Sequence, residues 1–197
     1  MRLVCLTGGI ASGKTTVGRV FAEMGSHVEN ADELAKSLAA TPQIRKALTE
    51  ALGRSFYTPA GELKRLELAA YIFNHPEALQ KVNSLIHPRV IAELEHRYEQ
   101  IKDIHGCFVV ETALAVETGY ADTFEVVIAV AASRAERLRR LVDMEELSPD
   151  QAAARMAAQL PQEEIIKRAD YILENDGSIE ELEEKARALY EKLCKDE

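Results

Sequence analysis

Residues 8–15 constrain this chain more than any other stretch, because they read Gly-Gly-Ile-Ala-Ser-Gly-Lys-Thr. The run fits the pattern G-x-x-x-x-G-K-[ST], in which backbone amides of a glycine-rich loop surround phosphate oxygens. Residues 3–6 form an apolar run suited to a buried strand, and residues 16–24 have the pattern of a helix. Because strand, loop and helix come in the order that the pattern needs, a nucleoside triphosphate site is favoured over a glycine turn that carries a lysine by chance.

The residues of this loop have separate expected roles. Lys14 is expected to reach the β and γ phosphates, and the hydroxyl of Thr15 is expected to bind Mg²⁺. The N-terminus of the following helix adds partial positive charge. The expected nucleotide contacts in the loop are Gly9, Ile10, Ala11, Ser12, Gly13, Lys14, Thr15 and Thr16.

The composition limits the class of protein. A formal net charge of −9 argues against a general nucleic-acid surface, although cations gathered in a cleft still allow an anion to bind. No apolar run approaches the length of a membrane span, and a strand that begins at the N-terminus leaves no room for a signal peptide. Cys5, Cys107 and Cys194 form no metal-binding pattern, and the first two are expected to be buried as small hydrophobes. We therefore expect one cytoplasmic domain without nucleic-acid or membrane partners.

Asp32 is the first candidate catalytic residue after the loop. Residues 26–29 are expected to form a second strand, which ends at Asn30-Ala31-Asp32. Ligands of open α/β sheets bind beyond the carboxyl ends of the strands, so Asp32 is a candidate to act on the group that accepts the phosphate. Asp is also a favoured N-cap, and a helix expected near Glu33 makes capping an equally good interpretation from the spacing alone.

Residues 36–104 contain no stretch that predicts a strand, and we expect an inserted helical lobe that binds the substrate. Helices are expected from Pro42 to near Gly53 and over residues 63–73, 76–86 and 90–101, with a break at His87-Pro88. The helix over residues 63–73 is expected to bury the face made of Leu63, Leu66, Ala70 and Phe73.

Three polar residues of this lobe are candidate substrate contacts. Arg65 and Arg89 are placed to bind an anionic substrate, although a solvated arginine on a helix face is the simpler interpretation of either one alone. His87 is as easily an N-cap or a packed histidine as a ligand contact.

The second half of the chain adds strands at residues 107–110, 125–131 and 171–173. Glu111 follows the first of these strands, where a carboxylate can hold Mg²⁺ or its water. The helix after Ser133 carries Arg134, Arg137, Arg139 and Arg140. We choose Arg140 as the phosphate contact and expect the others at the surface or in ion pairs. Residues 143–162, with a capping box at Ser148-Pro149-Asp150-Gln151, are expected to be a lid that excludes water.

Taken together, these motifs resemble those of the dephospho-coenzyme A kinase family nearly from end to end. The segments concerned are residues 6–15, Asn30-Ala31-Asp32, Leu63-Lys64-Arg65, Ile72-Phe73, Val82-Asn83 to His87-Pro88, residues 111–117, Ala169-Asp170 and residues 175–178. The phosphate loop alone is shared by many families, whereas the inserted lobe and the closing segment make the match specific.

The resemblance implies a P-loop α/β sandwich of three layers with a mostly parallel sheet, a helical acceptor lobe and a helical lid. It implies transfer of the ATP γ-phosphoryl group, with Mg²⁺, to the ribose 3′-hydroxyl of dephospho-CoA, the last step of coenzyme A synthesis. Asp32 would be the general base, Lys14 and Arg140 would stabilise charge on the transferring oxygens, and Asn175 would lie by the adenine. The expected substrate contacts are Thr7, Asp32, Arg65, His87 and Glu111.

The sequence departs from the family's pattern at four positions. Asn30 replaces the first Asp of the Asp-Ala-Asp segment, and Glu111 and Ala113 stand where the family usually has Asp and Pro. Met144 falls about where the family's lid carries an Arg, so Arg155 is a candidate replacement.

Three other functions fit parts of the pattern. The chain could be another P-loop kinase, acting on a nucleoside monophosphate or on shikimate, or it could be a nucleotide-dependent switch or an inactive relative. A switch is disfavoured because the chain contains no N-K-x-D motif. An inactive relative is disfavoured because Lys14, Thr15 and Asp32 are all present. We expect a monomer or a weak homo-oligomer.

Overall fold

The computed structural model describes residues 1–145 and 147–195, and within these ranges it does not describe the side chains of residues 145, 194 and 195. Contacts divide the chain into two compact units, one of residues 1–30 and 101–197 and the other of residues 31–100. The first unit holds the sheet, and the described secondary structure of the second is helical apart from one isolated bridge between Tyr57 and Leu63.

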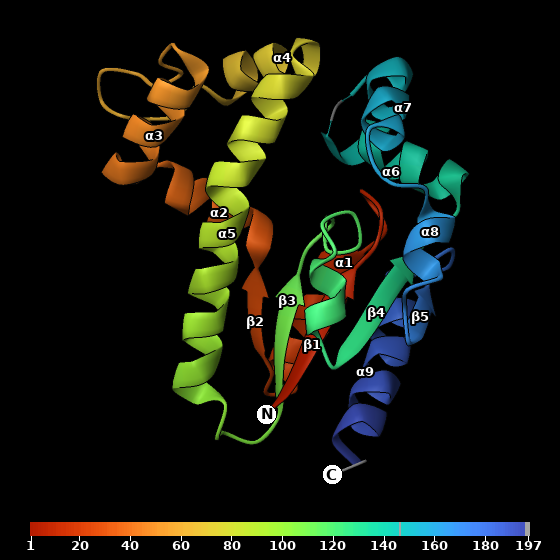
Figure 1. Cartoon of the computed structure of the whole chain (residues 1–197). Coiled ribbons are helices and arrows are strands. Elements are labelled where there is room, and N and C mark those ends of the chain that lie inside the picture. Colours follow the sequence, from red (N-terminus) through yellow and green to blue (C-terminus); the bar gives the residue numbers. More distant parts are fainter. Residues whose placement is uncertain (146, 196–197) are drawn as a thin grey trace. The chain divides into compact units, whose positions relative to one another are not determined.

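A parallel sheet of five strands forms the centre of the first unit, in the order β2-β3-β1-β4-β5 (Figure 1). The strands are β1 (Arg2–Thr7), β2 (His27–Asn30), β3 (Cys107–Glu111), β4 (Val126–Ala131) and β5 (Tyr171–Glu174). The central strands are mostly buried, because a parallel strand is covered on both faces, and each carries a continuous apolar run within it. The predicted α/β fold with a mostly parallel sheet is confirmed.

Helical segments cover both faces of this sheet. On one face α1 (Lys14–Glu23) and α9 (Ile179–Lys195) pack together over the sheet. The core there is made of Val4, Leu6, Val17, Phe21, Val109, Ile128, Leu182, Leu189 and Leu193, among others. Alternate strand residues such as Cys5 and Val127 point to the opposite face and are buried too. Other helical segments of this unit are η1 (Tyr120–Thr123), α6 (Arg134–Glu145), α7 (Pro149–Ala157) and α8 (Gln162–Ile166).

The second unit is built from α2 (Ala31–Ala39), α3 (Pro42–Leu52), α4 (Arg65–Asn74) and α5 (Pro76–Ile101), the last of which ends one residue into the first unit. Its core is made of Ile44, Leu48, Phe56, Leu68 and Val82. Pro42 occupies the first turn of α3 and Gly53 ends it in the left-handed region, with φ 69°, as predicted.

Two local predictions in this unit are wrong. The proline at 88 does not end a helix, because α5 continues through it. A proline inside a helix removes one backbone donor, and the Arg89 side chain donates to the carbonyl of Leu85 at 2.6 Å beside that point. The predicted apolar face of α4 is not buried either, since Leu66 and Phe73 are 85% and 79% exposed and Leu68 enters the core instead.

The segment predicted to be a lid is helical on both sides of a position outside the described residues, Glu146. The predicted capping box is present at the start of α7, where the Ser148 hydroxyl accepts from the Gln151 amide and the Gln151 side chain accepts from the Ser148 amide. Cys5 and Cys107 are buried as predicted, and burial raises the pKa of the Cys5 thiol to about 12. The side chain of Cys194 lies outside the described part.

Candidate functional site

The phosphate loop connects β1 to α1 with a backbone that favours glycine. Gly8 and Gly13 have φ values of 143° and 104°, and Ala11 is a non-glycine residue in the left-handed region at 58°. A β-carbon at Gly13 would also overlap the side-chain nitrogen of Asn175. Helix α1 begins at Lys14, so its free N-terminal amides face the loop. The Lys14 ammonium donates to the carbonyls of Gly8 at 3.0 Å and Gly9 at 3.2 Å, which holds its charge over the loop.

The two predicted metal-binding side chains meet in the first unit. The Thr15 hydroxyl donates to a carboxylate oxygen of Glu111 at 2.8 Å. Glu111 ends β3 opposite Leu6 of β1, and its side chain is buried. These are oxygen ligands of the kind that Mg²⁺ accepts, and the ion usually takes one or two such groups together with substrate phosphates. The described residues contain no cluster of three His, Cys, Asp or Glu that would hold a metal alone. The pair therefore fits a metal that arrives with a nucleotide.

Arg140 and Asn175 lie at the other end of the loop and hold it in place. Arg140 donates to the Ala11 carbonyl at 3.3 Å and to the Asn175 carbonyl at 2.8 Å. Asn175 is 6% exposed and donates through its side chain to the Ser12 carbonyl at 2.7 Å. Both predicted residues are therefore brought to the loop, where they donate hydrogen bonds to its backbone carbonyls.

Two further contacts of the loop were missed from the sequence. The Gln159 side chain, just after α7, accepts from the Ile10 amide at 2.8 Å. Arg137, which we expected at the surface or in an ion pair, lies against Gly9 instead. The spacing of Arg137 and Arg140, three residues apart, places them on one face of α6 and was the available signal. Arg139 is paired with Glu136 and Asp143, as expected.

Thr7 and Arg155, two further predicted residues, differ in their burial. The Thr7 side chain is fully buried at the end of β1, and its hydroxyl has no hydrogen-bond partner in the part of the chain that is described. Arg155, the candidate replacement for a lid arginine, is exposed on α7. Neither observation assigns a ligand.

The remaining predicted substrate residues belong to the second unit. Asp32 is the second residue of α2, and this helix begins at Ala31, so Asp32 is not its N-cap. Its carboxylate is exposed and has no hydrogen bond or ion pair within the described ranges. Arg65 is the first residue of α4 and is exposed. The Lys36 ammonium and, more weakly, Arg65 lower the pKa of the neighbouring Glu33 carboxyl.

His87 is half-buried on α5, one residue before Pro88. Burial lowers the pKa of this imidazole, which favours the neutral form near pH 7. A neutral imidazole donates and accepts one hydrogen bond each, so His87 is suited to a polar contact rather than to binding an anion by charge.

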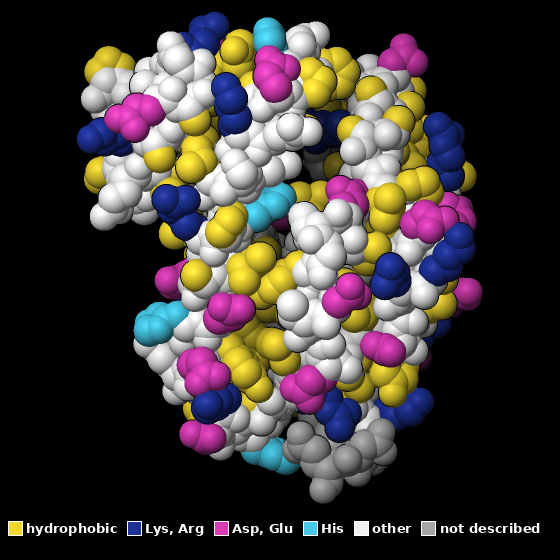
Figure 2. Space-filling view, viewed as in Figure 1, with side chains coloured by type: hydrophobic (Ala, Val, Ile, Leu, Met, Phe, Trp, Pro, Cys, Tyr) yellow, Lys and Arg dark blue, Asp and Glu magenta, His cyan; other side chains and the backbone are white. Residues whose placement is uncertain are grey.

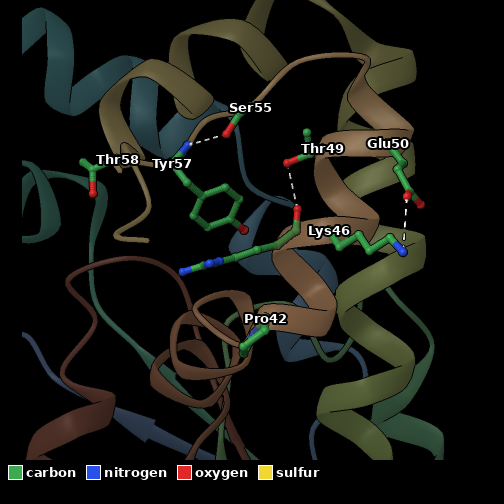
Figure 3. A pocket seen from close by; sticks show the side chains of 8 residues that line it. Pro42, Lys46, Thr49, Glu50, Ser55, Tyr57 and Thr58 are labelled. Atoms are coloured by element: carbon green, nitrogen blue, oxygen red, sulfur yellow. Dashed lines mark hydrogen bonds and ion pairs between the residues drawn. The ribbon is translucent and has the colours of Figure 1, made fainter. Parts of the chain in front are cut away.

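A pocket of about 400 Å³ lies within the second unit (Figure 3). It is lined by Pro42, Arg45, Lys46, Thr49, Glu50, Ser55, Tyr57 and Thr58. None of these residues was predicted to contact a ligand. Lys46 lies 4.0 Å from Glu50, so part of the local charge is paired.

The charges on the visible surface are mixed. Figure 2 shows acidic and basic side chains interspersed over this face. None of the described helices combines the length and the apolar character that crossing a bilayer requires.

Comparison with known proteins shows which family the chain resembles in sequence and fold. A family model of dephospho-CoA kinase matches residues 2–181. A dephospho-CoA kinase of Salinibacter ruber is 36% identical over 192 residues, covering 96% of each chain. A crystal structure from Thermus thermophilus has a TM-score of 0.82 at 32% identity, covering 98% of this chain and 97% of that one. A dephospho-CoA kinase from Campylobacter jejuni has a TM-score of 0.74 at 23% identity, covering 98% of each chain, which shows a shared fold.

Proposed function

The chain belongs to the dephospho-CoA kinase family, and from this premise we propose that it transfers the γ-phosphoryl group of ATP to the ribose 3′-hydroxyl of dephospho-CoA. The product is coenzyme A, and the reaction is the final step of its biosynthesis. The observation that carries the proposal is the contact of Thr15 with Glu111 beside Lys14, since this arrangement fits a metal–nucleotide complex at the loop.

Asp32 is the general base in this proposal. As the acceptor hydroxyl attacks the γ-phosphorus, its proton passes to the Asp32 carboxylate, the bond from the γ-phosphorus to the bridging oxygen breaks, and ADP leaves. The carboxylate of Asp32 is exposed and has no hydrogen bond or ion pair with the described residues, which supports this role. Its place in the sequence supports it too, because Asp32 comes two residues after Asn30, which is paired with Glu111 at the ends of β2 and β3. Lys14 stabilises charge on the transferring oxygens, and Arg65 and His87 contact the acceptor.

Thr15 and Glu111 are the proposed protein contacts of Mg²⁺. When bound, the ion neutralises charge on the phosphate oxygens. The Thr15 hydroxyl donates a hydrogen bond to the buried carboxylate of Glu111, and this bond orients both side chains for binding the ion.

Residues 36–104 form the acceptor-binding insert in this proposal, and residues 143–162 form a lid that excludes water from the reaction. The buried free thiol of Cys5 supports a reducing cytoplasm as the setting. We take the working form to be a monomer or a weak homo-oligomer.

The function is tested by measuring ADP formation from ATP with and without dephospho-CoA, with product identified by mass spectrometry. We expect rapid ADP formation only with dephospho-CoA, and a product heavier by one phosphoryl group. A nucleoside monophosphate and shikimate serve as control acceptors. Faster turnover with either of them would overturn the proposed substrate.

A metal requirement follows from the Thr15–Glu111 pair. In excess chelator we expect turnover to disappear and to return when Mg²⁺ is added in excess. The Glu111→Gln variant should need more Mg²⁺ for half-maximal rate, because an amide oxygen carries no charge to attract the ion. Glu117→Gln is a matched control from the segment that follows β3, since Glu117 accepts from the Leu160 amide and makes no hydrogen bond to Thr15 among the described residues. An undiminished rate in chelator would contradict the role of these residues.

A further inference from the structure

Arg137 lies against the phosphate loop in a space that only glycine leaves open. A β-carbon added to Gly9 would overlap Nη1 of Arg137 and would lie 3.3 Å from its Cζ. Gly9 also presents its carbonyl to the Lys14 ammonium at 3.2 Å. Two cationic side chains, one from α1 and one from α6, therefore converge on the same residue of the loop.

The Arg137 guanidinium makes no hydrogen bond or ion pair with any described residue. Its Nε is buried. Burial lowers the pKa of Arg137, while the charge of Glu163 on α8 opposes this effect and Arg134 adds to it. A half-buried cation without a partner is costly, and the Lys14 ammonium, which donates to the Gly9 carbonyl, adds a second positive charge at the same residue. An anion bound between the two side chains would offset this cost.

Arg139 and Arg140, two neighbouring arginines of α6, already have partners, and Arg134 at the start of the helix is exposed. Arg140 donates hydrogen bonds to the carbonyls of Ala11 and Asn175. Arg139 is ion-paired with Glu136 and Asp143. Met144, which stands about where the resemblance expects a lid arginine, is an apolar side chain that is 79% exposed. Arg137 is thus an arginine of this helix that lies against Gly9 of the loop and whose side chain makes no hydrogen bond with the described residues.

We propose that Arg137 is the guanidinium that binds the terminal phosphate of ATP at Gly9, in the role predicted for Arg140. The inference rests on the proposed function of the loop and assigns Arg140 to positioning the loop instead. A guanidinium offers paired N–H donors that match phosphate oxygens, and its charge stabilises the transferring group as charge develops there. Arg137 makes and breaks no covalent bond in this step.

The test compares Arg137→Gln with Arg139→Gln, two variants that each remove one guanidinium from α6. We expect Arg137→Gln to lower kcat by about 10²-fold, the usual effect of removing one preorganised donor from a transition state. The dissociation constant of ATP should rise by about tenfold or more, whereas that of ADP, which lacks the terminal phosphate, should change little. Arg139→Gln should stay within about twofold on every measure, because exposed ion pairs contribute little.

Equal kinetics and equal ATP affinities of the two variants would overturn the proposal. The binding comparison needs no acceptor, so it judges Arg137 even if wild-type enzyme fails to phosphorylate dephospho-CoA, which would refute the proposed function alone. Melting temperatures separate folding from binding, and Arg137→Gln should melt no lower than wild type because no native partner is lost. Should that variant unfold, Arg137→Lys keeps the charge and is expected to retain discrimination of ATP over ADP, and loss of that discrimination in folded protein would refute the role.

Discussion

Asp32→Asn should lower kcat by about 10³-fold while leaving the dissociation constant of ATP within about twofold of wild type. General base catalysis by a placed carboxylate contributes about 10²- to 10⁴-fold, and an amide of the same shape cannot accept the proton. Asp32 is exposed and makes no side-chain hydrogen bond within the described ranges, so its replacement should not disturb folding. Rapid-quench turnover and calorimetric binding of ATP measure the two quantities separately.

Glu33→Gln is the matched control for this experiment. It removes one carboxylate from the same turn of α2, next to Asp32, but Glu33 is ion-paired with Lys36. We expect its turnover to stay within about twofold of wild type. If Asp32→Asn turns over as fast as this control, Asp32 is not the base. If it loses ATP binding instead, Asp32 serves the metal or the structure.

The conformation of the P-loop could be predicted from the sequence because it depends on local residues. The glycines at 8 and 13 adopt the backbone angles that their motif requires, and α1 begins at the lysine of the motif. The partner of Thr15 was also within reach, because Glu111 ends an apolar strand and carboxyl ends of parallel strands share one edge.

Other features could not be predicted because they depend on what packs against a helix. Leu66 and Leu68 are both leucines of α4, and only the neighbouring elements decide that the second enters the core. The choice between base and N-cap for Asp32 depended on whether α2 begins at Ala31 or later, and helix starts are poorly defined by sequence. Arg137 could not be told apart from the other three arginines of α6 by sequence, because its contact with Gly9 depends on how α6 packs against the loop.

Lys14→Ala should lower kcat/KM by about 10⁴-fold, with losses in both ATP affinity and turnover. Removing one preorganised donor to the transferring group costs about 10²- to 10³-fold in kcat. Hydrogen bonds to a charged group contribute about 1.5–3 kcal/mol, which is about 10- to 100-fold in ATP affinity. The two effects combine because the Lys14 ammonium, held at the carbonyls of Gly8 and Gly9, is in place before and during transfer. Initial rates over a range of ATP concentrations, with calorimetric binding of ATP, measure both.

Lys167→Ala controls for the loss of a lysine, because Lys167 is paired with Glu164 outside the loop. It should behave like wild type in both assays. Lys14→Arg is the more demanding variant, since it keeps the charge but exchanges a compact ammonium for a larger planar group. We expect it to recover affinity more than turnover, because binding needs a positive charge near the phosphates whereas transfer needs that charge at one position. Lys14→Ala with wild-type kcat and ATP affinity would show that the loop does not bind phosphate, and the proposed reaction would then lose its physical basis.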